Sequence, residues 1–332
     1  MNRSHAQGVA ESVSVFCPGT IANVGPGFDC LGLVLDGLGD RITVRRSATG
    51  VDVIRVFGRD APFVPLEFDK NCAGIAAAAA RRDLLQEADT DASSSSQAAW
   101  GSHAVSLEIE LERALPLSGG LGASAAASVG GALATALYLG HTPSANQLID
   151  WALCGEMAVA GRHLDNIAPC VLGGLTLSFF AEDTPVVRSY PCSSRFFVSL
   201  ITPKMRIETK AAREILPGQV NSKTYATGLS RALGVAMALR EGDGELLAHC
   251  LEDPFAVPVR GSLIPHYVEA RTTALACGAL GFSISGSGPT LFAVSDSFDL
   301  ANHIAERVAQ IYFEMGVSTH VCSLGQQGAH RL

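Results

Sequence analysis

Apolar and polar residues alternate with two different periods along the chain. Strict alternation predicts β-strands with one buried face, and recurrence every three to four residues predicts helices. The expected strands cover 12–16, 40–46, 51–57, 104–111, 173–180, 196–202, 281–284 and 290–294, and the expected helices cover 70–85, 124–138, 144–160, 208–216, 227–241, 265–276 and 301–315. Because strands and helices mix without regular βαβ alternation, we expect an α+β fold rather than a doubly wound parallel sheet.

Local details refine this prediction. Cys17, Pro18 and Gly19 are expected to end the first strand, and the ranges 40–46 and 51–57 are expected to pair. Thr142 or Ser144 is expected to cap the helix over 144–160. The polar run 89–97 (DTDASSSSQ) is typical of a surface loop.

Composition then narrows the class of protein. The chain has 332 residues, 48% of them hydrophobic and 17% charged, which indicates a folded protein of about two domains. With a net charge of -8, the chain lacks the excess of basic residues that is typical of a general nucleic-acid binder, so we expect no nucleic-acid partner. The nine cysteines are scattered without a CxxC pair, which favours isolated thiols over a disulfide framework or a zinc site.

Neither a secretory signal nor a membrane span is expected. No hydrophobic stretch follows the basic residues at the N-terminus, which favours a cytoplasmic protein. No charged residue lies between Arg113 and Asp150, but glycine, serine and proline dilute the apolar residues of that window. A buried helix after a glycine turn therefore explains it better than a transmembrane helix.

The first of three glycine-rich stretches is 116–127 (PLSGGLGASAAA), which runs directly into a strong helix former. Glycines let the main chain approach a ligand closely, and a helix N-terminus presents unpaired N–H groups to an anion. This pattern predicts a phosphate cradle, although an ordinary helix start beside a close packing contact would share it. It is not a Walker A loop, which would need a lysine in the turn.

The other two stretches are less specific on their own. In 20–31 (TIANVGPGFDCL), Asn23 and Asp29 bracket a stiff loop that either presents their side chains or bonds to them internally. The stretch 281–288 (GFSISGSG) lies between apolar strands, and forms either a hairpin or a second backbone nest for phosphate.

Taken in order, these motifs carry a resemblance that covers nearly the whole chain. Residues 116–126 are similar to the ATP signature PxxxGLGSSAA of the GHMP small-molecule kinases, with Ala123 in place of the first serine, and 281–288 is similar to their C-terminal glycine motif. Within this family the homoserine kinase branch is indicated by further segments, namely 22–32 (ANVGPGFDCLG), 162–169 (RHLDNIAP) with Glu156 upstream, 209–217 (TKAAREILP) and 253–265 (DPFAVPVRGSLIP).

The resemblance implies a fold and an activity. The fold is the two-domain GHMP kinase fold, with an N-terminal ribosomal-S5-like α/β domain over 12–188 and a C-terminal ferredoxin-like domain over 189–332. The activity is phosphorylation of the side-chain hydroxyl of L-homoserine to O-phospho-L-homoserine, a step of L-threonine biosynthesis. The resemblance further implies ATP as the co-substrate, Mg²⁺ as the cofactor, direct in-line transfer and a homodimer.

The resemblance also implies which residues bind ATP and metal. Ser124 and Glu156 match the metal-binding positions of the family. The ATP-binding positions are Pro116, Leu117, Ser118, Gly119, Gly120, Leu121, Gly122, Ala123, Ser124, Ala125 and Ala126, together with Lys70, Asn71, Gly286 and Gly288. The alanine at position 123 removes one hydroxyl contact but leaves the main-chain donors.

Homoserine carries an ammonium, a carboxylate and a primary hydroxyl, and its expected ligands suit these groups. Arginine can grip both oxygens of a carboxylate. The substrate-binding positions are Asn23, Asp29, His163, Thr209, Arg213 and Arg260, and the catalytic positions are Asp165, Asn166, Ser124 and Glu156. Asp165 lies where many relatives place a carboxylate near the acceptor hydroxyl, but homoserine kinases are thought to transfer without a dedicated base. We expect base-free transfer because a loose transition state needs little prior deprotonation.

Two alternatives remain at this point. One is a GHMP kinase for a sugar or an isoprenoid alcohol, which a pair of arginines disfavours because a neutral sugar has no carboxylate. The other is a ligand sensor that kept the fold without catalysis, which should have lost Glu156, Ser124 or a loop glycine and has lost none.

Overall fold

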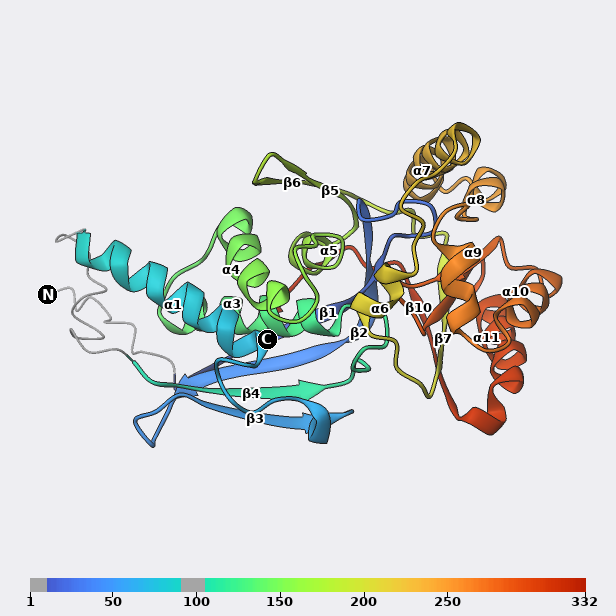
Figure 1. Cartoon of the computed structure of the whole chain (residues 1–332). Coiled ribbons are helices and arrows are strands. Elements are labelled where there is room, and N and C mark those ends of the chain that lie inside the picture. Colours follow the sequence, from blue (N-terminus) through green and yellow to red (C-terminus); the bar gives the residue numbers. More distant parts are fainter. Residues whose placement is uncertain (1–10, 91–104) are drawn as a thin grey trace, which may run out of the picture.

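Two β-sheets lie next to each other along the length of the molecule, and helices cover both (Figure 1). The computed structural model describes residues 11–90 and 105–332. The first sheet contains β1 (Ser12–Ala22), β2 (Leu31–Arg46), β3 (Val53–Gly58), β4 (Leu107–Arg113), β5 (Leu175–Ala181), β6 (Thr184–Tyr190) and β11 (His330–Arg331). Its main order is β11-β1-β2-β4-β3, and β5 pairs with β2 and β6.

The helices on the first sheet are α1 (Cys72–Thr90), α3 (Ala123–Tyr138), α4 (Ala145–Met157) and α5 (Ile167–Leu172). The uncharged helix α3 is buried along nearly its whole length between the sheet and α1. Close packing requires glycine there, because a Cβ at Gly131 would lie 2.2 Å from the carbonyl oxygen of Ala73. The expected capping at Ser144 is confirmed, since its hydroxyl accepts the N–H of Gln147 in a capping box.

Two predictions about the strands are wrong. β1 does not end at Cys17 but continues to Ala22, because a register shift between Pro18 and Thr20 lets the strand bend past a proline that has no N–H. β3 does not pair with β2 but runs parallel to β4, which lies between them. A parallel pair needs a crossover, and the intervening α1 supplies it.

The second sheet is antiparallel with the order β10-β7-β9-β8. It consists of β7 (Phe197–Pro203), β8 (Gly281–Ile284), β9 (Leu291–Ser295) and β10 (Val317–Ser323). The helices α10 (Tyr267–Ala276) and α11 (Phe298–Ile311) complete a βαββαβ unit whose strand order is 4-1-3-2, which is the predicted ferredoxin-like arrangement. α11 is amphipathic, with Ala301, Ile304, Ala305 and Val308 buried on one face.

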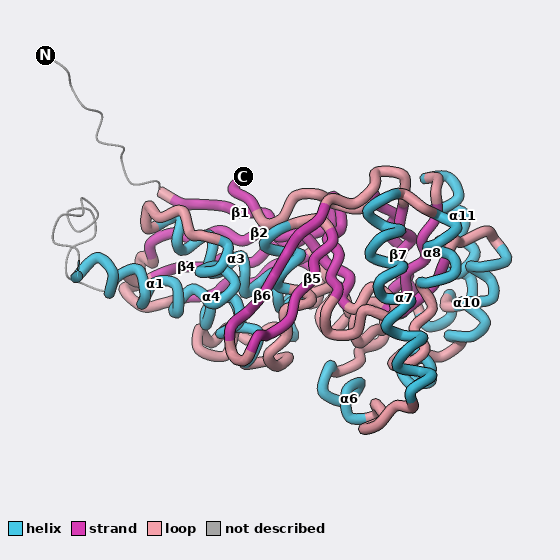
Figure 2. Tube along the Cα trace, turned by 90° about the horizontal axis from the view of Figure 1, so that it is seen from above, coloured by secondary structure: helices cyan, strands magenta, loops and turns pink. Residues whose placement is uncertain are grey.

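Between the strands of this half lie shorter elements. They are α6 (Thr209–Glu214), α7 (Ser222–Glu241), α8 (Gly244–Cys250), α9 (Val257–Arg260) and the 3₁₀ turns η2 (Gly261–Leu263) and η3 (Phe313–Met315), while η1 (Ala61–Phe63) belongs to the first half. Figure 2 shows α6 standing apart from the body of the molecule, whereas α7 and α8 lie together near the second sheet.

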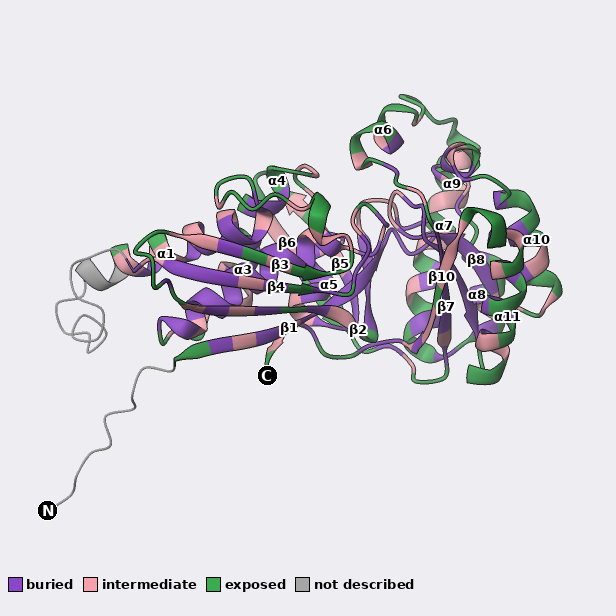
Figure 3. Cartoon of the chain, turned by 90° about the horizontal axis from the view of Figure 1, so that it is seen from below, coloured by how far each residue is buried: buried purple, intermediate pink, exposed green. Residues whose placement is uncertain are grey.

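A continuous core joins the two halves, and it contains most of the central strands of both sheets, whereas the edge strands β3, β6 and β10 are mostly not buried (Figure 3). Val15, Val198 and Phe292 belong to the same buried cluster, and the last strand, β11, returns to pair with β1. The division of the chain at residues 188 and 189 stays a prediction.

The remaining observations concern the membrane, the thiols and the polar run. Across residues 11–90 and 105–332, none of the helices combines the length and the apolar character that a membrane crossing requires. All nine cysteines are free. The run 89–97 begins in the last two residues of α1, and its remainder lies outside the described residues.

Candidate active site

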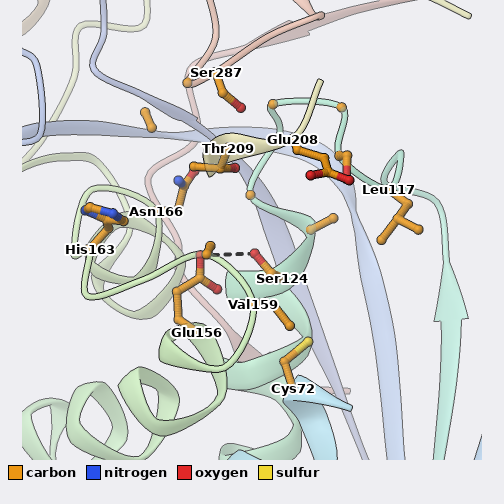
Figure 4. Close-up of a pocket in the computed structure, with 18 of the residues that line it drawn as sticks. Cys72, Leu117, Ser124, Glu156, Val159, His163, Asn166, Glu208, Thr209 and Ser287 are labelled. Atoms are coloured by element: carbon orange, nitrogen blue, oxygen red, sulfur yellow. Dashed lines mark hydrogen bonds between the residues drawn. The ribbon is translucent and has the colours of Figure 1, made fainter. Parts of the chain in front are cut away.

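A cavity of about 510 Å³ lies where the glycine-rich segments of both halves meet. The segment before α3, the loop between β1 and β2, the α4–α5 connection, α6 and the turn after β8 all contribute to its wall, and Figure 4 shows their side chains converging on it. Contributions from so many distant segments make this cavity the candidate active site.

The segment 116–122 is an open backbone turn that faces the cavity. Ser118, Gly120 and Gly122 have positive φ angles of 51°, 82° and 68°. A Cβ at Gly120 would lie 2.4 Å from the carbonyl oxygen of Ser285, so only glycine fits there. Gly122 caps α3 without a side-chain hydrogen bond, which leaves the first N–H groups of the helix available to an anion.

A buried carboxyl group lies at the start of α3. Ser124 Oγ donates a hydrogen bond of 3.0 Å to Glu156 Oε1, while Glu156 Oε2 is buried without a hydrogen-bond partner among the described residues (Figure 4). Burial raises the pKa of Glu156 to about 7, with a smaller contribution from the nearby Asp165. The described residues contain no cluster of three or more metal-ligating side chains. The unpartnered Oε2 of Glu156 and the adjacent hydroxyl of Ser124 are oxygen donors of the kind that suit a hard cation with further ligands from phosphate and water.

Asp165 and Asn166 follow on the connection into α5. Thr20 Oγ1 donates to Asn166 Oδ1 at 2.8 Å, which orients the amide. Burial and the charge of Asp29 raise the pKa of Asp165 to about 7. Two neighbouring carboxyl groups with raised pKa values are typical of a functional site, because folding alone gains nothing from burying them.

The opposite end of the cavity holds an ion pair. Arg213 on α6 donates from both Nη atoms to Asp29, at 2.9 and 2.8 Å. Its Nη2 also lies 3.4 Å from His163 Nδ1, and burial together with Arg213 lowers the pKa of His163. The predicted ligands Asp29 and Arg213 are therefore brought together, but in this structure they bind each other.

Arg260 lies beside this pair and is almost fully buried. Its Nη1 donates to the carbonyl of Gly286 at 2.9 Å, and Asn23 Nδ2 donates to the same oxygen at 3.2 Å. The guanidinium groups of Arg213 and Arg260 each lie 5.3 Å from the centre of the Phe28 ring. Like charges this close lower the pKa of Arg260, after burial as the largest cause. The arrangement concentrates positive charge where a carboxylate would neutralise it.

Most of the residues expected from the sequence line the cavity. They are Asn23, Asp29, Lys70, Asn71, Pro116, Leu117, Ser118, Gly119, Gly120, Gly122, Ala123, Ser124, Glu156, His163, Asp165, Asn166, Thr209, Arg213, Arg260 and Gly286. Four others, Leu121, Ala125, Ala126 and Gly288, are buried outside its lining and support the turns from behind. The binding roles of all these residues stay predictions.

Sequence reasoning missed Arg113 and Phe28. Arg113 lines the cavity three residues before Pro116, its Nε lies 3.5 Å from Asp40 Oδ2, and its Nη2 has no hydrogen-bond partner within the described ranges. The only sequence signal for it is a basic residue at the border of a long uncharged window. Phe28 is an uncharged residue without a sequence signal of its own. It contacts two arginines, Arg213 and Arg260, that are distant in the sequence.

Comparison with known proteins shows the family of this chain. Its residues 84–174 match the model of the GHMP kinases N-terminal domain, and residues 235–314 match that of the GHMP kinases C-terminal domain. The chain belongs to the GHMP kinase family. This kinase is 34% identical to the homoserine kinase of Arabidopsis thaliana, an alignment that covers 94% of this chain and 82% of that protein. It is 33% identical to the homoserine kinase of Pyrococcus abyssi, with coverage of 91% and 93%.

Solved structures agree with these relatives. The crystal structure of homoserine kinase from Cytophaga hutchinsonii superposes on this kinase with a TM-score of 0.87 at 31% identity, covering 99% and 100% of the two chains. Mevalonate kinase from L. major, at 16% identity and a TM-score of 0.67, shares the fold alone. The predicted family, its homoserine kinase branch and the predicted α+β fold are confirmed.

Proposed function

We propose that this kinase transfers the γ-phosphoryl group of Mg-ATP to the side-chain hydroxyl of L-homoserine and forms O-phospho-L-homoserine, a step of threonine biosynthesis. The observation that carries this proposal is a single cavity with a glycine turn and an open helix N-terminus at one end and two arginines beside an aspartate at the other. The full-length similarity to homoserine kinases supports the same substrate.

The phosphate end works through the main chain. The turn around Gly119 and Gly120 and the free N–H groups at the start of α3 would bind the phosphate oxygens, and the helix dipole adds favourable potential there. These donors are held rigidly, because Ser285 Oγ bonds to the carbonyl of Gly120 and the N–H of Thr290 bonds to that of Gly119. Positioning of this kind supplies most of the catalysis in phosphoryl transfer.

Ser124 and Glu156 would hold the magnesium ion. The unpartnered Oε2 of Glu156 and the adjacent Ser124 hydroxyl provide a hard oxygen pair, which suits Mg²⁺. When bound, the ion would neutralise charge on the transferred phosphoryl group. Glu156 would then be ionised, since a cation removes the cost of burying its negative charge.

Homoserine would enter by exchange of ionic partners. Asp29 would leave Arg213 to receive the ammonium, while Arg213 and Arg260 would receive the carboxylate. Thr209 lies one helical turn before Arg213 on α6 and faces the same cavity. After this exchange each carboxylate, that of Asp29 and that of the substrate, would face a cation, which limits the desolvation cost of binding.

Near the hydroxyl, the residues of the chain favour transfer without a dedicated base. The amide of Asn166, oriented by Thr20, would polarise the hydroxyl of homoserine without accepting its proton. Because a loose transition state needs little prior deprotonation, Asp165 would contribute hydrogen bonding and charge rather than full proton abstraction.

We also propose that the chain forms a homodimer through α7. Tyr225, Leu229, Leu233 and Met237 recur every four residues on this helix, and each is more than half exposed. Arg231 is the one charged residue between Thr224 and Leu239, and it bonds to the backbone and carboxylate of Glu252. A two-fold axis at Arg231 would oppose Leu229 with Leu233 and Tyr225 with Met237 without juxtaposing unpaired charges.

An ADP-release assay tests the proposed reaction. Mg-ATP is offered with L-homoserine, mevalonate, galactose or buffer alone, and we expect turnover with L-homoserine only. Turnover with another alcohol would void the amino-acid roles of Arg213 and Arg260. ATP binding without turnover on any of them would favour the sensor alternative.

A further inference from the structure

We propose that Arg206, which lies outside the cavity, is a positioning residue for the nucleotide end of the site. It lies between β7 and α6 in the second half of the molecule, yet its side chain contacts the segment 60–65 of the first half. The inference rests on the proposed kinase function and adds a specific route by which the second half controls ATP binding.

The route begins at Asp60. Arg206 Nη2 donates to Asp60 Oδ1 at 3.1 Å, and Asp60 Oδ2 accepts the N–H of Leu117 at 3.0 Å. One carboxylate therefore joins an arginine of the second half to the phosphate-binding turn of the first. Although burial opposes it, the bonds from Leu117 and Arg206 lower the pKa of Asp60, which keeps its carboxylate charged.

The same arginine holds the neighbouring wall of the cavity. Its guanidinium lies 4.0 Å from the centre of the Phe63 ring, a cation–π contact at the end of η1. The next two residues, Val64 and Pro65, line the cavity, and the carbonyl of Pro65 accepts a bond of 2.7 Å from Asn71 Nδ2. Segment 60–65 is thus fixed by Arg206 at one end and by Asn71 at the other.

The position of these contacts determines which substrate's binding depends on them. Leu117, Val64 and Pro65 all lie at the nucleotide end of the cavity, whereas Asp29, Arg213 and Arg260 form the amino-acid end. Arg206 and Asp60 are both partly exposed, so their ion pair contributes little to overall stability. Loss of Arg206 should therefore weaken nucleotide binding while leaving amino-acid binding and unfolding unchanged.

Arg206→Met tests this inference, and Arg59→Met is its matched control. Arg59 Nη2 also joins the two halves, through a bond of 3.1 Å to Ser318 Oγ. Its charge helps to lower the pKa of Asp60, but it donates no hydrogen bond to that carboxylate, so it is not part of the link from Arg206 to Leu117. We expect Arg206→Met to raise the KM for ATP and the Kd for ADP about five-fold, with the KM for homoserine and the Tm unchanged. Arg59→Met should leave all four values unchanged.

Asp60→Asn tests the route itself. Asparagine tolerates the left-handed backbone at this position, where φ is 57°, and it still offers an oxygen to Leu117. If Arg206 acts through Asp60, the double variant should bind ADP no more weakly than the weaker single variant.

Three outcomes would overturn the inference: an unchanged ADP affinity in Arg206→Met, an equal loss in Arg59→Met, or an additive loss in the double variant. ADP affinity is measured by calorimetry on the whole protein and needs no turnover. The inference is therefore tested even if the ADP-release assay gives no activity with homoserine.

Discussion

Glu156 and Asp165 are carboxyl groups buried beside the same cavity, and burial raises both pKa values to about 7. A carboxyl group whose pKa is higher in the folded than in the unfolded state binds more protons when folded. Its effect on stability is therefore unfavourable at high pH and fades as pH falls below about 7. This cost is typical of groups retained for function rather than for folding.

Asp165→Asn should make the ligand-free kinase less sensitive to pH. Between pH 5 and pH 8 the wild-type protein loses on the order of a few kcal/mol from ionising Asp165, and asparagine cannot ionise. We expect the Tm of the variant minus the Tm of the wild type to increase from pH 5 to about pH 7 and then to level off. The measurement is thermal unfolding of both proteins at pH 5, 6, 7 and 8. A Tm difference that does not change with pH would contradict the prediction.

The two carboxyl groups should also differ in their effect on turnover. We expect Asp165→Asn to lower kcat modestly, about five-fold, whereas Glu156→Ala lowers it at least a hundred-fold and raises the Mg²⁺ concentration needed for half-maximal rate. Steady-state rates over a magnesium series check both. A pH–rate profile with an acidic limb that disappears in Asp165→Asn would instead establish Asp165 as a base.

Among the elements, the turn before α3 depends on Gly120 for two separate reasons. Its φ of 82° is unfavourable for any other residue, and a Cβ would collide with the backbone of Ser285. Gly140, after the end of α3, shares the first reason only: its φ is 84°, with nothing within 4 Å of a built Cβ. Comparing substitutions at Gly120 and Gly140 therefore separates the effect of backbone strain from the effect of the close contact with Ser285.

Gly120→Ala should weaken nucleotide binding, and Gly140→Ala should not. Both changes carry a strain of about 1–2 kcal/mol, because alanine disfavours the left-handed region. Only Gly120→Ala displaces the turn from the glycine segment after β8, so we expect ADP affinity to fall at least ten-fold in that variant alone. Calorimetry with ADP, together with thermal unfolding, distinguishes the two effects. Equal ADP affinity in both variants would show that the close contact with Ser285 is unimportant.

For the molecule as a whole, the prediction of a homodimer rests on the exposed stripe of α7, which consists of Tyr225, Leu229, Leu233 and Met237. Leu233→Glu places a charge at the centre of the stripe without disturbing the buried face of the helix. We expect sedimentation velocity to show a dimer for the wild type and a monomer for this variant, because burying an unpaired carboxylate costs several kcal/mol. Val268→Glu, an exposed position on α10, is the control and should remain dimeric. A monomeric wild type would contradict the proposal.

The sequence alone determined those features in which neighbouring residues act together. The glycine turn and helix start at 116–126 were predictable because glycines and a following helix former specify them within a dozen residues, and the phosphate-binding role of this segment stays a prediction. Helices α6, α7, α10 and α11 and the cap at Ser144 were predictable for the same reason, since hydrophobic period and capping are local properties, whereas the short helices α8 and α9 were not predicted. The family motifs also made most of the residues that line the cavity predictable from the sequence.

Only the tertiary structure decided which distant residues meet. Asp29 and Arg213 are 184 positions apart, and nothing in either segment indicates that they bind each other in the absence of substrate. The insertion of β4 between β2 and β3, and the contact of Phe28 with two arginines, likewise depend on how layers pack. Local pattern specifies which face of an element is buried, but the partner on that face is chosen by the free energy of packing the whole chain.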